Sequence, residues 1–542
     1  MSEQSPAIAR PARRSNFRST QSEQAVAAKP VGFGSILFPP GPESLKADRA
    51  DEPDSFVDLN LDQVIAAVVA TRDEEVLRPF FYSPYRNEEI VRYRQAVFSD
   101  LERPELFNLF PRFTGAMRGV RVNLHYADKI SYRSHKHTVF LRAARLYCEG
   151  VEVLARDLRS AVPRSPGLEN LLAYLESYLA SSAFQRLSEE TGELRDVLSK
   201  LSYGMLFRGD KVTVRKYASE PDYTATILQR FAKFREADGQ SPAPCKPKDD
   251  FSLNHIEQAI LEFVSRLFPE QFRRLDGYVA RHTGFIDETI ARFDREIGFY
   301  VAYLDFIEPL KCSGLPFCHP AVSVSSKKTE VKGSFDLALA AKLIHETGTV
   351  VCNDFHLSDR ERLLVVSGPN QGGKTTFARM FGQLHFLAGL GCPVPGTTAR
   401  LFLPDRIFTH FEREEDITNL RGKLEDELVR LHASCESMTS DSVIVLNEIF
   451  NSTSLDDQVF LSSRVLERIL AADSIGVCVT FIDLLSTLSD KTVSMVSTVD
   501  LDDPARRTFE IIRKPADGLA YALSLAQKHG VTYEQLCRRI RP

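Results

Sequence analysis

Residues 368–375 read Gly-Pro-Asn-Gln-Gly-Gly-Lys-Thr, which fits the phosphate-loop pattern G-x-x-x-x-G-K-[S/T]. The apolar run 363–366 stands before this loop and predicts a strand, and residues 377–387 predict a helix after it. A strand before and a helix after are the context that the pattern requires. The glycines let backbone N–H groups turn inward around phosphate oxygens, and the helix N-terminus adds about half a positive charge there. The loop therefore predicts a nucleotide-binding site.

A second apolar run, residues 443–446, ends in Asn447 and Glu448. In phosphate-loop ATPases such a strand ends near the Mg²⁺ ion, with a carboxylate that polarises the attacking water. We therefore expect Glu448 and Lys374 to be catalytic, with Lys374 at the β and γ phosphates and the Thr375 hydroxyl on Mg²⁺. The loop residues predicted to bind the nucleotide are Gly368, Pro369, Asn370, Gln371, Gly372, Gly373, Lys374, Thr375 and Thr376.

The fold expected is multidomain, a core of long helices followed by an α/β domain. Over residues 320–542, strand-like apolar runs at 363–366, 443–446 and 476–481 alternate with helices, which is typical of a largely parallel sheet. Over residues 55–319 the signal is mostly helical. Apolar residues recur at alternating steps of three and four, and the longest series runs from Ile286 to Ile307. Such a seam predicts a long helix packed along another helix.

Residues 205–217 interrupt the helical pattern and predict a two-stranded hairpin around Gly209. Its cations outweigh Asp210, so the hairpin carries about +3 locally. A basic hairpin between long helices suits contact with a DNA phosphate backbone, and the alternative is a solvated surface hairpin. The predicted DNA-binding residues are Arg208, Lys211, Arg215 and Lys216. The loop at 237–247, rich in Pro and small residues, is expected to be mobile.

Composition excludes several classes of protein. The chain has 73 acidic and 68 basic residues and a formal net charge of −5, which argues against a uniformly basic nucleic-acid-binding protein. No apolar run approaches the ~18 residues that span a bilayer, so no membrane partner is expected. The nine cysteines follow no framework pattern and favour reduced thiols in the cytoplasm. Cys312, Cys318 and His319 invite a zinc site, but no second ligand pair accompanies them.

Residues 1–54 predict a disordered tail, because prolines, Ser, Gln and Ala dominate it. Arginines among serines near its start resemble a targeting peptide, although Glu3 and Glu23 weaken that interpretation. One apolar island, Phe-Gly-Ser-Ile-Leu-Phe at residues 33–38, stands inside the tail. It is either a docking peptide or a strand or turn packed on the chain's own body, and we favour the second interpretation.

These motifs resemble the MutS family of DNA mismatch-repair ATPases. Residues 368–376 are similar to that family's Gly-Pro-Asn phosphate loop, and residues 447–454 to its Asp-Glu-Ile-Gly-Arg-Gly-Thr-Ser-Thr stretch. Asn353 precedes Gly368 by 15 residues, as an Asn does in the family, and residues 508–527 resemble the closing strand and helix of its ATPase domain. Residues 59–63 and 93–97 resemble the start of its helical core. The resemblance runs from about residue 56 to the end and is specific only in the ATPase region.

The resemblance implies an ABC-type phosphate-loop ATPase domain over 320–542, with Asn353 at the nucleotide. It implies a lever domain over 55–319 that carries a small clamp-like hairpin. MutS ATPases are dimers in which each nucleotide lies between one phosphate loop and a signature segment of the other subunit, here residues 417–428. The implied activity is Mg²⁺-dependent hydrolysis of ATP coupled to clamping of double-stranded or branched DNA, in repair or recombination. The expected assembly is a homodimer or a heterodimer, in the cytoplasm at the nucleoid.

Several positions depart from the family pattern. We find no Phe-x-Glu before Phe234, so a short member without the domain that reads mismatches is expected. Asn447 replaces the usual Asp beside Mg²⁺; an amide can still orient a metal-bound water, which predicts slow turnover. Three further differences are Gly422 and Lys423 in place of Ser-Thr in the signature, Phe481 in place of the switch His, and Val350 in place of an adenine-stacking aromatic.

Two other functions remain open at this point. One is a non-hydrolysing nucleotide switch, which Asn447 and the altered signature favour and the retention of Glu448 and Lys374 disfavours. The other is a related ABC-type ATPase that acts on chromosomes or on a non-DNA partner. Near the signature, His410 and Glu412 are candidates to approach the nucleotide, although such residues are more often packing or solvated groups. The acidic run 425–427 is read as a solvated helix face.

Overall fold

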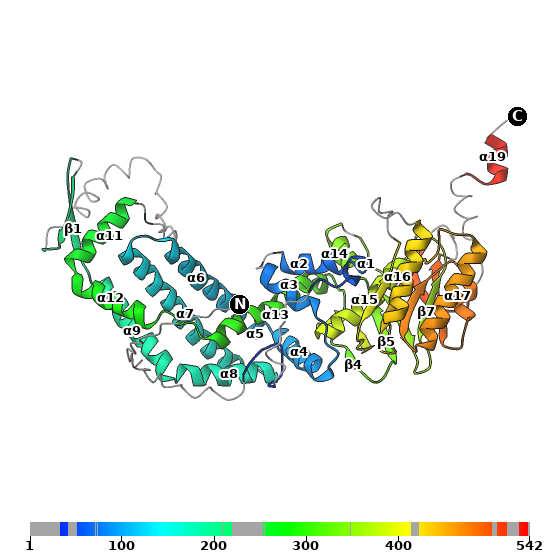
Figure 1. The fold of residues 1–542 in the computed structure, drawn as a ribbon, viewed down its shortest axis with the longest axis horizontal. Coiled ribbons are helices and arrows are strands. Elements are labelled where there is room, and N and C mark those ends of the chain that lie inside the picture. Colours follow the sequence, from blue (N-terminus) through cyan, green and yellow to red (C-terminus); the bar gives the residue numbers. More distant parts are fainter. Residues whose placement is uncertain are drawn as a thin grey trace, which may run out of the picture.

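The computed structural model describes residues 33–41, 51–70, 72, 74–209, 211–218, 253, 255–346, 348–412, 422–500, 507–516 and 530–539. Within these residues the molecule is elongated, with a helical arm at one end and a domain of helices and strands at the other (Figure 1). This arrangement agrees with the expected order of a helical part followed by an α/β part.

Two groups of helices build the arm and the region that joins it to the sheets. The first comprises α1 (Ser55–Asp58), α2 (Leu61–Val69), α3 (Glu74–Tyr82), α4 (Glu88–Leu101), α5 (Pro104–Phe107), α6 (Leu109–Lys129), α7 (Arg133–Ala161), α8 (Pro166–Leu179) and α9 (Ser182–Ser199). The second comprises α11 (His255–Leu267), α12 (Pro269–Arg281) and α13 (Glu288–Cys312). The hairpin between the groups is formed by β1 (Tyr203–Arg208) and β2 (Lys211–Lys216), which pair antiparallel.

Helix α13 is the long helix that the seam from Ile286 to Ile307 predicts. Asp287 caps it, because its side chain accepts hydrogen bonds from the backbone N–H groups of Thr289 and Ile290. The apolar residues of the seam from Ile290 to Ile307 are buried, and burying each such side chain stabilises the fold by roughly 1.5–3 kcal/mol. The helix packs on α6 in the arm and on α2, α3 and α14 (Leu337–Glu346) near the sheets. It therefore joins the two ends of the molecule.

The strands after α13 form a main sheet and smaller ones. The strands are β3 (Phe317–Cys318), β4 (Ala321–Ser323), β5 (Thr329–Ser334), β6 (Asn353–Leu357), β7 (Leu363–Ser367), β8 (Val394–Pro395), β9 (Thr398–Phe402), β10 (Ile407–His410), β11 (Val443–Asn447), β12 (Ile475–Val479), β13 (Thr492–Val499) and β14 (Arg507–Arg513). The main sheet has the order β10-β11-β12-β7-β13-β14, and only its β13–β14 pair is antiparallel. The largely parallel sheet is therefore confirmed.

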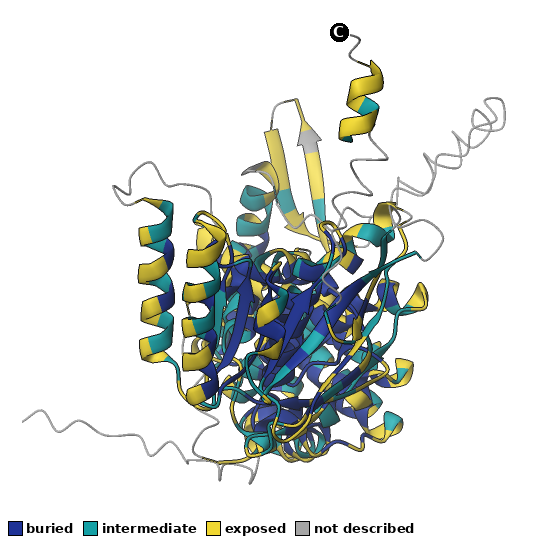
Figure 2. Cartoon of the chain, turned by 90° about the vertical axis from the view of Figure 1, so that its right-hand side faces the viewer, coloured by how far each residue is buried: buried dark blue, intermediate teal, exposed yellow. Residues whose placement is uncertain are grey.

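Helices flank this sheet, so its central strands are buried on both faces (Figure 2). The remaining helices are α15 (Lys374–Leu390), α16 (Lys423–Ser437), α17 (Leu455–Ala471), the short 3₁₀ helix η2 (Asp483–Thr487) and α19 (Tyr533–Arg539). Helix α15 is buried almost all round, because it packs on β11 and β12 and also on α4. Gly382 in α15 lets Leu59 approach closely, since a Cβ there would lie 2.5 Å from a Leu59 methyl carbon. One hydrophobic core thus continues from the helices into the sheet.

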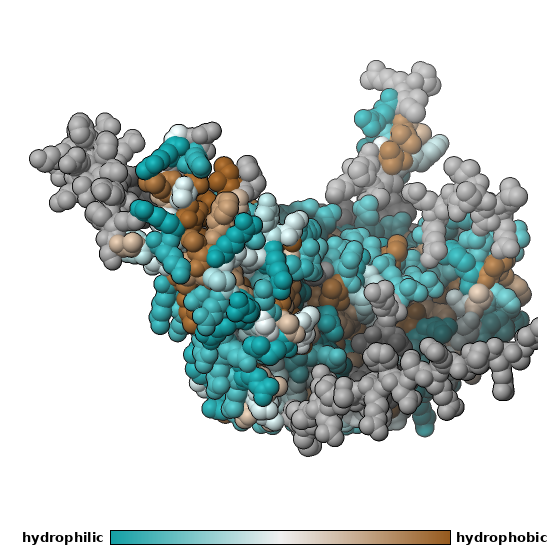
Figure 3. Space-filling view, turned by 60° about the vertical axis from the view of Figure 1, so that its left-hand side comes forward, coloured by the Kyte–Doolittle hydropathy of each residue, from teal (hydrophilic) through white to brown (hydrophobic). Residues whose placement is uncertain are grey.

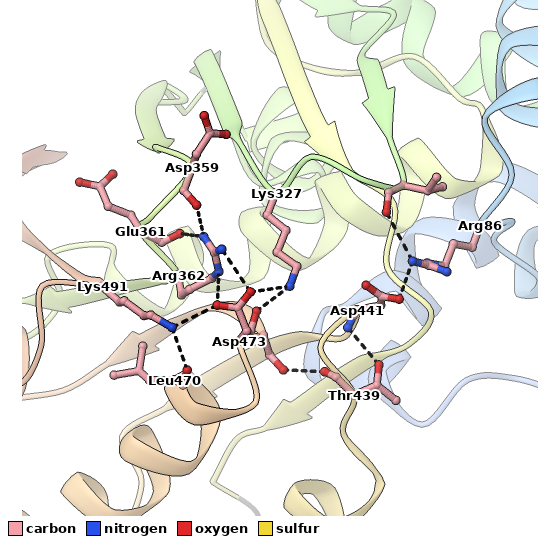
Figure 4. Close-up of polar contacts among 12 residues, drawn as sticks. Arg86, Lys327, Asp359, Glu361, Arg362, Thr439, Asp441, Leu470, Asp473 and Lys491 are labelled. Atoms are coloured by element: carbon pink, nitrogen blue, oxygen red, sulfur yellow. Dashed lines mark hydrogen bonds and ion pairs between the residues drawn. The ribbon is translucent and has the colours of Figure 1, made fainter.

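Near the amino ends of the central strands, the carboxylate of Asp473 contacts three cationic side chains (Figure 4). Asp473 accepts hydrogen bonds from Arg362 before β7, from Lys327 before β5 and from Lys491 before β13, with N–O distances of 2.9, 2.9 and 3.2 Å. Burial opposes ionisation of Asp473, but the hydrogen bonds from these cations outweigh it and hold its pKa well below the usual range. The cluster ties together the strand ends opposite the phosphate loop.

The apolar island at 33–38 packs on the chain's own body, as we favoured. The side chains of Ile36, Leu37 and Phe38 are at most 3% exposed, and the backbone around them bends without joining a sheet. Membrane passage is not indicated in the described part, where every helix is too short or too polar to cross a bilayer. The loop predicted at 237–247 and most of the predicted tail lie outside the described residues.

Candidate functional site

The phosphate loop folds tightly onto strand β13. Gly368 and Gly373 have φ angles of +119° and +86°, a region that favours glycine. A Cβ on Gly372 would lie 2.2 Å from the Ser497 Oγ atom, and that hydroxyl donates a 2.6 Å hydrogen bond to the Gly372 carbonyl. Helix α15 begins at Lys374, three residues before the predicted start. The first N–H groups of a buried helix therefore adjoin the loop.

Lys374 lies inside the loop. Its Nζ atom donates to the carbonyls of Gly368 and Pro369 at 3.1 and 3.0 Å, and it lies 4.2 Å from the ring centroid of Phe481. The side chain is buried, and this burial lowers the pKa of its ammonium, an effect that the charge of Glu448 partly opposes. Phe481, at the position of the family's switch His, thus makes a cation–π contact with the loop lysine.

Thr375 and Asn447, the two predicted magnesium ligands, lie side by side. The Thr375 hydroxyl donates a 2.9 Å hydrogen bond to the Asn447 Oδ1 atom at the end of β11. Strand β12 lies between β11 and β7, so the loop and α15 reach across β12 to make this contact. Both side chains present oxygen atoms, the donor element that Mg²⁺ prefers, although neither oxygen is charged. Their chemistry therefore fits Mg²⁺, while the charge that balances the ion has to come from elsewhere.

Glu448 occupies a strained turn directly after β11. Its φ angle is 53°, that of Phe450 is 58°, and its backbone N–H donates a 2.9 Å hydrogen bond to the Val479 carbonyl at the end of β12. Half-burial raises the pKa of its carboxyl, the charge of Lys374 lowers it, and that of Glu412 raises it further. The two predicted catalytic residues, Glu448 and Lys374, therefore interact electrostatically.

The prediction that the acidic run 425–427 is a solvated face is wrong for Glu427. This side chain is only 7% exposed, and its Oε1 atom accepts a 2.7 Å hydrogen bond from the Phe450 N–H and lies 3.2 Å from the His410 Nε2 atom. The reason is the helical period, because Glu427 stands four residues before the buried Leu431 on α16 and so shares its face. Reading that period from Leu431 would have identified Glu427 as an inward residue.

His410 and Glu412 have other partners than a nucleotide. His410 is buried against Glu427, whereas Glu412 accepts hydrogen bonds from Lys423 and, at 3.1 Å, from the Asn451 side chain. Lys423 begins α16, and residues 417–421 of the predicted signature segment lie outside the described residues.

Asn353 of β6 forms hydrogen bonds with β14 beside the phosphate loop. Its Nδ2 atom donates to the Phe509 carbonyl at 3.2 Å, and its Oδ1 atom accepts from the Ile511 N–H at 2.7 Å. It lines a pocket of about 390 Å³ between β5, β6 and β14. Val350, the residue at the adenine-stacking position, is half-buried against the core. Asn353 thus holds β14 in place beside the loop, because both its amide nitrogen and its amide oxygen bond to that strand.

The strand register divides the basic residues of the hairpin between its two faces. Arg208 pairs with Lys211 and Gly204 with Arg215, so three cations share one face. Tyr203 pairs with Lys216 on the other face, where the Lys216 Nζ atom lies 5.5 Å from the ring centroid of Phe268. Exposed hydrophobic side chains of the hairpin and of α11 gather at this end of the arm beside hydrophilic ones (Figure 3). The hairpin therefore has a basic face and an apolar face.

The zinc interpretation of Cys312, Cys318 and His319 gains no support. Across the described ranges, no three His, Cys, Asp or Glu side chains are grouped so as to hold a metal ion. The His319 Nε2 atom instead lies 3.6 Å from a carboxylate oxygen of Glu102.

Fold and site together define a protein with a long helical arm and a carboxy-terminal sheet domain, in which a glycine-rich loop meets the end of β11. Residues 364–530 match the family model of MutS domain V, so this part of the chain is similar to that domain. The resemblance to the MutS family is thereby confirmed, and the chain as a whole is consistent with a MutS family member.

Curated relatives agree with this assignment. The chain is similar to the DNA mismatch repair protein MutS of Exiguobacterium sp., with 36% identity over 24% of this chain and 15% of the relative. It is 29% identical to the DNA mismatch repair protein MutS 2 of Halobacterium salinarum over 33% of this chain and 21% of the relative. It is 27% identical to MutS of Ruminiclostridium cellulolyticum over 40% of this chain and 25% of the relative. The similarity therefore spans a quarter or less of these relatives' length.

Proposed function

We propose that this chain is an ATP-dependent DNA-binding protein of the MutS type that acts in DNA mismatch repair or recombination. One observation carries the proposal, namely that Lys374, Thr375, Asn447 and Glu448 meet where β7 and β11 end, with Thr375 and Asn447 in hydrogen-bond contact. These are the residue types that bind phosphates and activate water in phosphate-loop ATPases. The match to MutS domain V over 364–530 supports the same conclusion.

In this proposal the loop residues 368–376 and the start of α15 bind the phosphates of ATP through backbone N–H groups. Lys374 exchanges the carbonyls of Gly368 and Pro369 for phosphate oxygens, so its buried charge gains an anionic partner. The Thr375 hydroxyl, and the Asn447 amide through a water molecule, would hold Mg²⁺, which would supply positive charge against the phosphates. Asn353 contributes by supporting β14 beside the loop.

Glu448 is the proposed catalytic base. Its carboxylate orients the attacking water and accepts hydrogen bonds from it, while Lys374 stabilises the charge that develops on the γ-phosphate. Because Asn447 brings no negative charge to the Mg²⁺ site, we expect slow turnover. If turnover is absent altogether, the protein is a nucleotide-dependent switch, and Glu448→Ala then leaves nucleotide occupancy unchanged.

We further propose that the arm carries the DNA contact. The basic face of the hairpin, Arg208, Lys211 and Arg215, lies at the end of the arm far from the sheet (Figure 1). Lys216, on the opposite face, makes the weaker contribution. The proposed substrate-side partner is double-stranded or branched DNA, and the proposed assembly is a homodimer or a heterodimer that closes on ATP. A related chromosome-acting ABC-type ATPase is the alternative, and it gains no support from the MutS matches.

Titration with a fluorescent ATP analogue, with and without Mg²⁺, tests the nucleotide site. Lys374→Ala is expected to abolish binding. Thr375→Val removes the hydroxyl with little change in volume and is expected to abolish the effect of Mg²⁺, whereas Thr375→Ser keeps the hydroxyl and the effect. Binding that survives Lys374→Ala, or equal behaviour of the Val and Ser variants, would contradict the assignment.

A further inference from the structure

The island at residues 33–38 lies in a groove lined by α4, α8 and α13, far from it in the sequence. Ile36 reaches α8 at Gly167, where an added Cβ would lie 3.1 Å from the Ile36 Cδ1 atom. Phe33 packs edge-on against Phe293 of α13, with ring centroids 6.3 Å apart. The island joins no sheet. It is therefore held by side chains of the three helices.

Side chains of the groove bind consecutive backbone carbonyls of the island. Arg292 donates to the Gly34 carbonyl at 2.9 Å, Tyr93 to that of Ser35 at 3.1 Å, Tyr300 to that of Ile36 at 2.8 Å and Arg94 to that of Leu37 at 3.0 Å. When each consecutive carbonyl accepts a hydrogen bond from a side chain, the position of the peptide is fixed although it pairs with no strand. The groove thus recognises the backbone of its occupant.

Two buried ionisable side chains of the groove have partners in the island. The Glu296 Oε2 atom accepts hydrogen bonds from the Ser35 hydroxyl at 2.8 Å and from the Ile36 N–H at 2.9 Å. Arg94 is only 2% exposed and lies between the rings of Phe38, Tyr85 and Phe299. Leaving a buried charge without partners is strongly unfavourable. The chemistry of the groove is therefore built around a bound peptide.

The same contacts link the arm to the helix that follows the phosphate loop. The Arg94 Nη1 atom donates at 3.1 Å to the Leu390 carbonyl at the end of α15, while its Nε atom holds the island. The island in turn is bonded to Glu296 and Tyr300 of α13. Hydrogen bonds between buried groups thus connect the end of α15 to Arg94, Arg94 to the island, and the island to α13.

We propose that the groove formed by α4, α8 and α13 is a peptide-binding site, and that residues 33–38 are its ligand, a separable strap that fastens α13 to the end of α15. The ligand class is a short bent peptide with a small hydroxyl residue followed by two or three large apolar side chains. Its specificity comes from Glu296, which requires a hydroxyl and an N–H, and from the space that Gly167 leaves for Ile36.

The test uses the full chain with residues 33–38 replaced by alternating Gly and Ser, its folding checked by circular dichroism. A fluorescein-labelled peptide with the sequence of residues 31–40 is titrated in and its anisotropy measured. We expect saturable binding to the replaced chain and none to the unmodified chain, whose groove is filled. A control peptide with Ile36→Ser and Leu37→Ser is expected to bind at least about tenfold more weakly, because both side chains are fully buried. A folded replaced chain that does not bind the peptide, or an unmodified chain that binds it equally, would overturn the proposal.

Hydrogen exchange of the full chain provides a second test if the replaced chain does not fold. The amides of Ile36 and Leu37 are expected to exchange slowly in the unmodified chain, since both donate hydrogen bonds at 3.0 Å or less. Glu296→Leu should accelerate them at least about tenfold while β7 remains protected. Exchange at the free-peptide rate in the unmodified chain would refute the strap, and so would unchanged protection in the variant.

Discussion

The division of the hairpin into a basic and an apolar face leads to a quantitative prediction about DNA binding. The register places Arg208, Lys211 and Arg215 together on one face, and all three side chains are exposed. Lys216 projects from the opposite face over the ring of Phe268. The account therefore assigns phosphate contacts to three of the four cations that the sequence suggested.

Each phosphate contact contributes about 0.9 to the slope of log affinity against log salt concentration. Replacing all three residues of the basic face by Ala should therefore reduce the slope by about 2.7 for each bound hairpin. Between 50 and 200 mM salt, those contacts account for a factor of roughly 40 in affinity, or about 2 kcal/mol. Lys216→Ala, which removes the same charge type from the same hairpin, should leave the slope almost unchanged.

The assay is fluorescence anisotropy of a labelled duplex, titrated at several salt concentrations with the unmodified chain, the triple variant and Lys216→Ala. Circular dichroism checks that each variant keeps its helical arm. A triple variant that retains the full slope would show that the basic face does not contact the DNA phosphates. A Lys216→Ala variant whose slope falls by one third or more of the decrease in the triple variant would also contradict the assignment of faces.

Three further predictions concern the sheet domain. Glu427→Ala should lower the free energy of unfolding by roughly 1–3 kcal/mol, because it leaves a buried N–H without an acceptor, whereas Glu425→Ala on the exposed side of the same helix should have little effect in denaturant titrations. Phe481→Ala should raise nucleotide affinity about twofold to fivefold, since Lys374 then gives up no cation–π contact on binding; weaker binding in calorimetry would contradict this. Asp473→Asn should cost about 1 kcal/mol at pH 7, because the carboxylate is 38% exposed and its ion pairs are partly screened. Its depressed pKa stabilises the fold above the unfolded value near 3.9, so the gap between the two melting curves should close as the pH falls below about 4.

Local patterns predict several elements of this fold. The apolar runs at 363–366 and 443–446 lie in β7 and β11, and the seam lies in α13 from Ile290 to Ile307, with Ile286 just before the helix. The phosphate-loop pattern places the Thr375 hydroxyl at Mg²⁺, and the resemblance to MutS ATPases places Asn447 beside the same ion; the hydrogen bond between the two side chains agrees with both expectations. These features depend on residues close in sequence or on a shared family motif.

Contacts between distant segments could not be predicted in this way. The charge run predicts a solvated Glu427, because its acidic neighbours hide the helical period that points it toward Phe450. Charge counting groups Lys216 with the other cations, because it ignores the register that the turn and the pairing set. The burial of residues 33–38 depends on Glu296, some 260 residues away, and no local signal marks such a partner.

Steady-state hydrolysis of ATP shows whether this chain is a DNA-coupled ATPase. The purified chain is assayed without DNA and with matched duplex, mismatched duplex and a branched junction, alongside Lys374→Ala. We expect slow hydrolysis that requires Lys374 and whose rate changes when DNA is added, and the most effective DNA then distinguishes repair from recombination. Hydrolysis that persists in Lys374→Ala, or whose rate is the same with each DNA as without DNA, would show that the chain is not a DNA-coupled ATPase of this kind.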